Sequence, residues 1–203
     1  YMSEPVIVND PKGMCAFIKC AAEMELRDDE LTCKGKTVLL DYYFNNEWKK
    51  DATGKMVRWH YTWEDKSNGG YAMLGEIFRR HGAVTRSLEK LPTSFELRQA
   101  SIYILVDPDT DKETERPRYI NPKDAISISN WVKNGGVLVL LSNDAGNAEF
   151  KNFNNLAAKF GIQFNEDNKN LVKGDNFSEG AVFVPENHSI LGDAKRLYIK
   201  EFC

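Results

Sequence analysis

Hydrophobic residues fall into two kinds of pattern that alternate along this chain. Continuous apolar runs, each of the length of a buried strand, occur at 37–41, 101–106 and 137–141. Apolar residues that recur at the spacing of one helix face occur between and after these runs, at 70–80, 121–132 and 149–160. Strands that alternate with helices of this length predict βαβ units and a mostly parallel sheet.

Weaker segments extend the pattern. A separate N-terminal helix is predicted over 13–26, where the apolar residues share one face, after a start at Asp10 and Pro11. Glycines that follow the helical stripes mark their ends, at Gly82, Gly135 and Gly161. Further short strands are predicted at 83–85, 162–164, 181–184 and 197–199.

The predicted fold class is α/β, a three-layer sandwich around a mostly parallel, flavodoxin-like sheet of the class I glutamine amidotransferase-like kind. Near-continuous apolar strands such as 137–141 fit a sheet that is covered on both faces. In the strand order 2-1-3-4-5, the ligand crevice lies between the first and third strands, at their carboxyl ends. A binding site is therefore expected in the residues that follow 37–41 and 101–106.

A charged stretch divides the chain in two. Arg27–Glu30 and Lys34–Lys36 separate the N-terminal helix from the alternating pattern. Residues 1–34 are predicted to be a terminal helix segment of an upstream domain, and residues 35–203 the α/β domain. The chain stops at Cys203 just after a strand-like run, which leaves open whether the α/β domain is complete.

Composition limits the classes of partner. The chain has 203 residues with 27 basic and 30 acidic side chains, so its formal net charge is −3. This balance provides no basic surface for nucleic acid or for an anionic membrane. No apolar run approaches the roughly 20 residues that span a bilayer, and the first residues do not have the pattern of a signal peptide.

The four cysteines match no metal or redox motif. They stand at 15, 20, 33 and 203, without a C-x-x-C pair. Unpaired thiols are expected, and the alternative is a bridge from Cys33 to Cys15 or Cys20 in an oxidising compartment.

The loop after the first strand, residues 42–68, is unusually long and aromatic. It contains three of the four tryptophans, Trp48, Trp59 and Trp63. The rings are suited to stacking on sugar faces, and neighbouring polar side chains are suited to binding hydroxyls; alternatively, the rings pack on the sheet or on another domain. A small hairpin is expected around Thr53 and Gly54.

The loops after the third and fourth strands match no known metal-binding or catalytic motif. Residues 107–115 are rich in acids, but Lys112 and Arg118 stand where a calcium loop needs glycine and glutamate, so a solvated acidic loop is expected and no metal site. Residues 142–147 lack G-x-S-x-G, and Asn143 with Asp144 is expected to cap the next helix. No phosphate-binding glycine motif occurs, so no cofactor is predicted.

The candidate ligand-binding residues follow from the expected crevice and from the aromatic loop. They are Asp41, Asn45, Trp59, His60, Trp63, Asp107, Asn143 and Asp144.

Several strings of residues together resemble a known family. They are Pro5–Gly13, Phe17-Ile18, Ala21–Glu25, Lys36–Trp48, Trp59–Trp63, Asn68–Gly70, Ile104–Thr110 and Gly135–Leu141. The first three resemble the last helix of the α/α-barrel in family 105 glycoside hydrolases, the unsaturated rhamnogalacturonyl hydrolases. The others resemble the α/β extension of its longer bacterial members.

This resemblance implies a parent enzyme that cleaves unsaturated uronic acid from pectin-derived oligosaccharides, in the periplasm or outside a bacterium. The family's catalytic aspartates lie in the barrel and match no position here, so no catalytic residue is assigned. The implied function is a non-catalytic accessory domain that binds carbohydrate or packs on the upstream α/α-barrel.

Two other hypotheses remain open. One is an independent amidotransferase-like or esterase-like hydrolase that uses Asp41, Asp107, Ser142 and His60. The other is a purely structural domain whose aromatic loop is attached to a neighbour.

Overall fold

The computed structural model describes residues 32–67, 69–143, 146–166, 176–186 and 196–198. Its centre is a four-stranded sheet in the order β4-β1-β5-β6, in which every neighbouring pair is parallel. The predicted parallel, flavodoxin-like sandwich is confirmed, because this order corresponds to the first four strands of the 2-1-3-4-5 arrangement. The strands are β1 (Thr37–Asp41), β4 (Val84–Leu88), β5 (Ile102–Val106) and β6 (Val137–Leu141).

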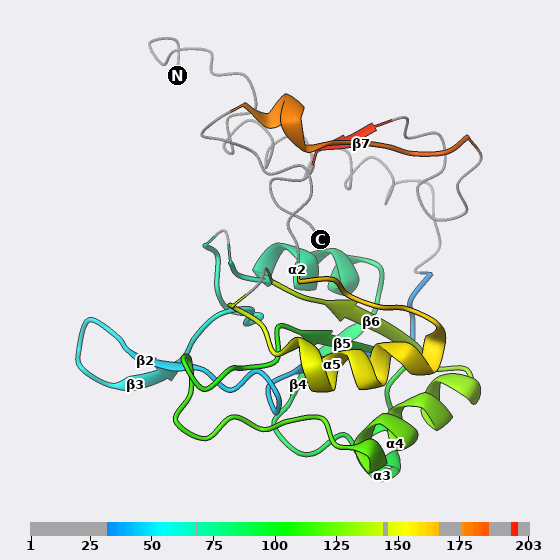
Figure 1. Cartoon of the computed structure of the whole chain (residues 1–203), viewed down its shortest axis with the longest axis horizontal. Helices are drawn as coiled ribbons and strands as arrows, with labels where there is room; N and C mark the ends of the chain where they lie inside the picture. Colours follow the sequence, from blue (N-terminus) through cyan, green and yellow to red (C-terminus); the bar gives the residue numbers. More distant parts are fainter. Residues whose placement is uncertain (1–31, 68, 144–145, 167–175, 187–195, 199–203) are drawn as a thin grey trace.

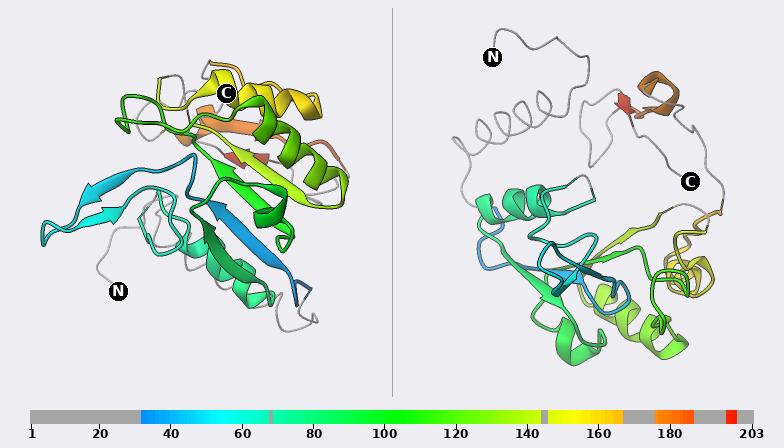
Figure 2. Two further views of the ribbon diagram at one scale, coloured as in Figure 1. Left: turned by 90° about the horizontal axis from the view of Figure 1, so that it is seen from below. Right: turned by 90° about the vertical axis from the view of Figure 1, so that its left-hand side faces the viewer.

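Helices cover both faces of the sheet, and its two central strands, β1 and β5, are almost fully buried. The outer strands are more open than the sequence predicts: β4 carries three polar residues, and Val137 and Leu141 at the ends of β6 are exposed. Successive residues of one strand enter opposite layers: Leu39 packs into one buried cluster, and Val38 and Leu40 into the other. Figure 2 shows α2 on one side of the sheet, and α4 and α5 on the other. The helices are α2 (Ala72–Arg80), α3 (Ser94–Leu97), α4 (Pro122–Lys133) and α5 (Phe150–Ala157), which continues into η1 (Ala158–Phe160).

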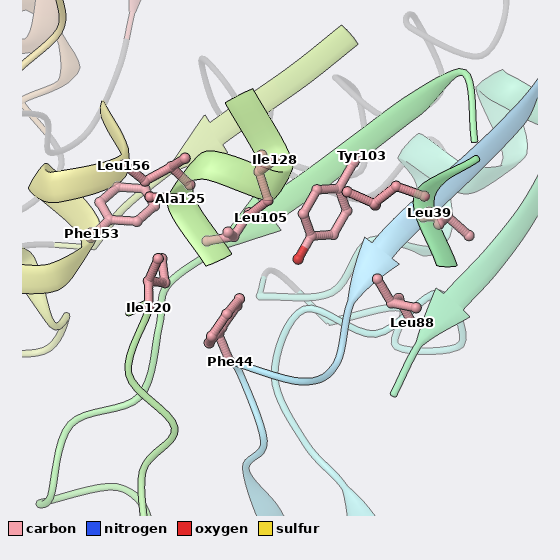
Figure 3. Packing of buried hydrophobic residues seen from close by; sticks show 11 residues of the cluster. Leu39, Phe44, Leu88, Tyr103, Leu105, Ile120, Ala125, Ile128, Phe153 and Leu156 are labelled. Carbon is pink, nitrogen blue, oxygen red and sulfur yellow. The ribbon is translucent and has the colours of Figure 1, made fainter. Parts of the chain in front are cut away.

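The larger cluster lies between the sheet and the α4–α5 layer (Figure 3). Tyr103 and Leu105 of β5 meet Ile128 of α4 and Phe153 of α5, and all four side chains are fully buried. Phe44, from the loop after β1, enters the same cluster. The start of the long aromatic loop is therefore anchored in the core.

The helix ends follow the predicted chemistry, with one exception. Asn121 caps α4 in a reciprocal capping box with Asp124, and Gly135 ends the helix at φ +99°. The prediction that Asn143 caps α5 is wrong, because the cap is Glu149, which accepts from the backbone N–H of Asn152. Asp144, the other predicted cap, lies outside the described residues.

The predicted strand at 162–164 does not form. The backbone N–H and C=O of Phe164 instead bond the side-chain amide of Asn154, at 2.8 and 2.9 Å. The Phe164 ring packs 4.8 Å from that of Phe153. The amide and the ring contact together hold this segment against α5, so it adds no strand to the sheet among the described residues.

Two short hairpins complete the described chain. The hairpin expected near Thr53 is present and projects from the domain (Figure 1). Asp51 forms its turn by accepting from the backbone N–H groups of Thr53 and Lys55. The tail strands predicted near 181–184 and 197–199 pair antiparallel after a short 3₁₀ turn. The elements are β2 (Trp48–Lys50), β3 (Met56–Arg58), η2 (Phe177–Gly180), β7 (Ala181–Phe183) and β8 (Arg196–Tyr198).

Other expectations fall at the edge of the described chain or beyond it. The predicted helix at 13–26 and the cysteines at 15, 20 and 203 lie outside it, whereas Cys33 is a half-buried free thiol. No helix in the described part of the chain is both long and apolar enough to cross a membrane.

Two isoleucines on α4 test the assigned core. Ile128 is fully buried, whereas Ile126 is half exposed. We expect Ile128→Ala to lower the free energy of unfolding by about 2–5 kcal/mol, because it leaves a cavity. Ile126→Ala should change it by less than about 1 kcal/mol. Urea denaturation followed by circular dichroism measures both, and equal effects would contradict the assignment of this layer.

Candidate functional site

The strand order places a topological switch point between β1 and β5. From β1 the sheet extends to β4 on one side, and from β5 it extends to β6 on the other. Ligands of open α/β sheets bind at such a point, outside the carboxyl ends of the strands. Asp41 ends β1 and Asp107 directly follows β5, so two of the predicted site residues lie there.

Asp41 has a structural role. It is 1% exposed, and its carboxylate accepts from the hydroxyl of Tyr103 at 2.6 Å and from the backbone N–H groups of Phe44 and Asn45 at 2.8 and 3.0 Å. Burial raises its pKa to about 6, although these hydrogen bonds lower it. Both oxygens are already bonded, so Asp41 shapes the turn after β1 and is not placed to contact a ligand.

Asp107, unlike Asp41, has a carboxylate oxygen that accepts no hydrogen bond. Its backbone N–H donates to Leu141 O, and its C=O accepts from the side-chain amide of Asn45. Side-chain Oδ2 accepts from Asn143 Nδ2 at 3.4 Å, whereas Oδ1 is buried and has no hydrogen-bond partner. A buried polar atom without a partner costs about 1–3 kcal/mol, so it calls for a functional explanation.

The pKa of Asp107 reflects this environment. Burial, with smaller contributions from the charges of Glu113 and Glu47, raises it to about 7. Hydrogen bonding from the side chains of Tyr61 and Asn143 to the carboxyl group lowers it, although Oδ1 itself has no partner within hydrogen-bond distance. Asp107 therefore changes charge near neutral pH.

Backbone strain gathers at the same place. Three described residues other than glycine have left-handed backbones: His60 at φ +56°, Tyr61 at φ +46° and Asp107 at φ +45°. Residues other than glycine rarely adopt this backbone conformation, and each such residue destabilises the folded state by on the order of 1–3 kcal/mol. Such strain persists where the surroundings enforce it, commonly in ligand sites.

Further acids from two loops surround Asp107. Glu47 is buried and bonds His60 Nδ1 at 2.9 Å; burial raises its pKa, and His60 lowers it. Asp109 is 1% exposed and accepts from the backbone N–H of Asn46. Burial raises the pKa of Asp109 to about 6, and the charges of Glu47 and Glu113 add to the shift. The expectation of a solvated acidic loop is therefore wrong for Asp109.

Tyrosine side chains form another part of the site. The rings of Tyr61 and Tyr71 lie 5.6 Å apart, and the hydroxyl of Tyr61 accepts from Asn143 Nδ2 at 3.4 Å. Burial, and then the charge of Asp107, raises the pKa of each tyrosine well above its ordinary value. We call the assembled residues the switch-point cluster: Glu47, His60, Tyr61, Asp107, Asp109, Glu113 and Asn143.

The structure separates the predicted ligand residues into groups. It brings His60, Asp107 and Asn143 together at the switch point, with Asn45 linking the two loops through its bond to Asp107. Asp144 lies outside the described residues.

The tryptophan rings, which the sequence suggests for stacking on sugars, already make contacts within the protein. The Trp63 ring is buried beneath α2, and its indole N–H donates to Arg86 O. The Trp59 ring stacks on His60 with centroids 3.4 Å apart, and the ammonium of Lys49 lies over it at 4.9 Å. Trp48 is half exposed, with the Arg58 guanidinium over its ring.

Four members of the cluster are not among the ligand-binding residues that the sequence predicts: Glu47, Tyr61, Asp109 and Glu113. Glu47 and Tyr61 lie in the long aromatic loop, and Asp109 and Glu113 in the acidic loop. The signal that could identify them is their position in the loops after β1 and β5, where the topology rule places a site.

Two other arrangements of side chains are not found among the described residues. No three acidic, histidine or cysteine side chains within the described chain are arranged to hold a metal ion. Ser142 Oγ donates to the carbonyl of Asn143 rather than to a histidine, so Ser142 and His60 form no hydrolase dyad here.

Two cavities lie away from the switch point. One of about 590 Å³ is at the amino ends of β5 and β6, beside Cys33, Arg98 and Trp131. The other, of about 340 Å³, lies beside β4. Neither includes a residue of the switch-point cluster.

Comparison with known proteins adds evidence for the fold. No family model and no curated protein matches the sequence. Among solved structures, the chain is similar to "mmIFT52 N-terminal domain", with a TM-score of 0.53 and 18% identity. The match covers 80% of this chain and 63% of that chain. At this identity the likeness supports the α/β sandwich alone.

The titration of Asp107 predicts an unusual dependence of stability on pH. Its pKa is about 7 in the folded protein against an ordinary 3.8, so between pH 4 and pH 7 the folded state retains a proton that the unfolded state has released. The free energy of unfolding should therefore fall as pH rises through this window, by on the order of 3 kcal/mol. Asp107→Asn should flatten the decline and be more stable than the parent at pH 8. Urea denaturation at pH 4.5 and 8 tests this, with exposed Asp111→Asn as control; a decline unchanged in Asp107→Asn would refute it.

Proposed function

We propose that this chain is a non-catalytic accessory domain of a polysaccharide-degrading hydrolase and that it binds carbohydrate at the switch-point cluster. The observation that carries the proposal is Asp107, a strained and buried residue whose Oδ1 has no hydrogen-bond donor. A ligand that supplies the donor offsets the cost of leaving that oxygen unpaired.

The surroundings fit a sugar. Sugar hydroxyls both donate and accept, and the cluster combines a carboxyl acceptor, the Asn143 amide and the Tyr61 hydroxyl. The bonds from Asn143 Nδ2 to Tyr61 and to Asp107 are each 3.4 Å long, at the weak end of the range, so exchanging either for a bond to a hydroxyl costs little. The rings of Tyr61 and Tyr71 add apolar area of the kind that ligand sites combine with a few polar groups.

The type of parent enzyme rests on the resemblance to family 105 glycoside hydrolases. In that setting the partner is the upstream α/α-barrel, the ligand is a pectin-derived oligosaccharide, and the location is the bacterial periplasm or exterior. Packing of this domain on the barrel is compatible with sugar binding, because the switch-point cluster occupies only one edge of the sheet.

Binding of rhamnogalacturonan oligosaccharides tests the proposal. We expect a saturable change in tryptophan fluorescence, since Trp59 stacks on a residue of the cluster, and the same affinity by calorimetry. Asp107→Asn should weaken binding roughly tenfold, as expected for loss of a hydrogen bond to a charged group. Asp111→Asn, exposed in the same loop, should bind as the parent does. A flat titration, or equal binding by Asp107→Asn, would refute carbohydrate binding here.

A second candidate is an amidotransferase-like or esterase-like hydrolase, which one observation favours. The 2.9 Å bond between Glu47 and His60 Nδ1 is suited to orienting a general base; because Ser142 does not bond His60, that base would act on a water molecule. If this is the function, the chain should cleave a chromogenic acetate ester, and His60→Ala should lower the rate by about 100-fold. His81→Ala, on a histidine after α2, is the matched control; no cleavage by the parent would eliminate this candidate.

A further inference from the structure

The hydrogen bonds of the switch-point cluster define which donor is missing. Asp109 accepts from the backbone of Asn46, Glu47 is paired with His60, and Glu113 accepts from the N–H and hydroxyl of Thr110. Within the described chain, Asp107 Oδ1 is the buried side-chain oxygen without a partner. The unmet requirement is therefore one donor at one atom.

A single missing donor favours a hydroxyl group over a cation. An ammonium brings three donors and a divalent ion needs several oxygen ligands. The cluster offers one unsatisfied acceptor, and no three described side chains are arranged to hold a metal ion. One sugar hydroxyl satisfies Oδ1 and leaves no further buried group unpaired.

The charges of the cluster oppose an anion. Glu47 and Glu113 raise the pKa of Asp107, which means that their negative charge disfavours a further negative charge at this point. The nearby cations already have other contacts: Arg58 bonds Asn45 O, Lys112 bonds Gly146 O, and the Lys49 ammonium lies 4.9 Å over the Trp59 ring. A ligand carboxylate would lie among acids without a dedicated cation.

We infer that the switch-point cluster selects a neutral sugar residue, which donates one hydroxyl to Asp107 Oδ1, and discriminates against a uronate carboxylate. The inference rests on the proposed carbohydrate binding and specifies the class of sugar residue. A chain that alternates neutral and acidic sugars would therefore be bound through a neutral unit, with the uronate directed away from Glu47 and Glu113.

Rhamnogalacturonan oligosaccharides and their carboxyl-reduced derivatives test this selection, because the derivatives keep the same backbone and lose the charge. Calorimetry at pH 7.5 should show at least threefold tighter binding of the neutral derivative. Added salt should weaken that preference, since salt screens the repulsion. Glu113→Gln removes one repelling charge and should reduce the ratio of the two affinities, whereas Glu115→Gln, exposed in the same loop, should leave it unchanged.

The outcomes separate the inference from the function on which it rests. If both ligands bind and the native, charged one binds at least as tightly, the site accepts uronate and the inference is overturned, while carbohydrate binding stands. If neither binds, both fail. Binding of galactosamine but not of galactose would assign the site to an ammonium and would also overturn the inference.

Discussion

The carboxylate of Asp41, buried at the end of β1, accepts a 2.6 Å hydrogen bond from Tyr103 and two more from the backbone of Phe44 and Asn45. These bonds join the two central strands and turn the chain sharply as it leaves the sheet. Phe44 then enters the core and Asn45 reaches the carbonyl of Asp107. Without this turn, the long loop would not bring Glu47, His60 and Tyr61 to the carboxyl end of β5.

Asp107 destabilises the folded state. A left-handed backbone, a buried oxygen without a partner and neighbouring acids each cost free energy, and the strained residues His60 and Tyr61 lie beside it. The rest of the domain is regular: its central strands are buried and α4 has a complete capping box. The backbone strain, the unpaired buried oxygen and the clustered acids all occur around Asp107. Destabilising features that gather at one place are expected of a functional site.

If the switch-point cluster binds carbohydrate as proposed, its acidic side chains would select among sugars. Acceptor oxygens suit the many hydroxyls of a sugar, while their charge repels the carboxylate of a uronic acid. The hairpin β2–β3 begins directly after Glu47 and leads back to His60. The hairpin is therefore joined to the cluster at both of its ends, and its exposed Trp48 lies next in the chain to Glu47.

The sequence by itself determined the layers and the edge of the sheet at which a site belongs. Apolar runs and helix-spaced stripes are local consequences of burial, so β1, β5, β6 and α4 could be predicted with nearly their observed bounds, and the topology rule then placed Asp107 at the switch point. The strand expected at 162–164 failed because the Asn154 side chain bonds the backbone of Phe164. Apolar composition could not reveal that bond.

Only the tertiary structure decided which residues of the long loop serve the core and which serve the site. Trp59 and Trp63 look alike in sequence, yet one stacks on His60 and the other is buried with its indole bonded to Arg86. Asp41 and Asp107 each end a central strand, but one has every oxygen bonded and the other has an oxygen with no donor. Trp63 and Arg86 lie 23 positions apart in the chain, and Asp41 and Tyr103 lie 62 positions apart. Spacing along a sequence does not encode such contacts.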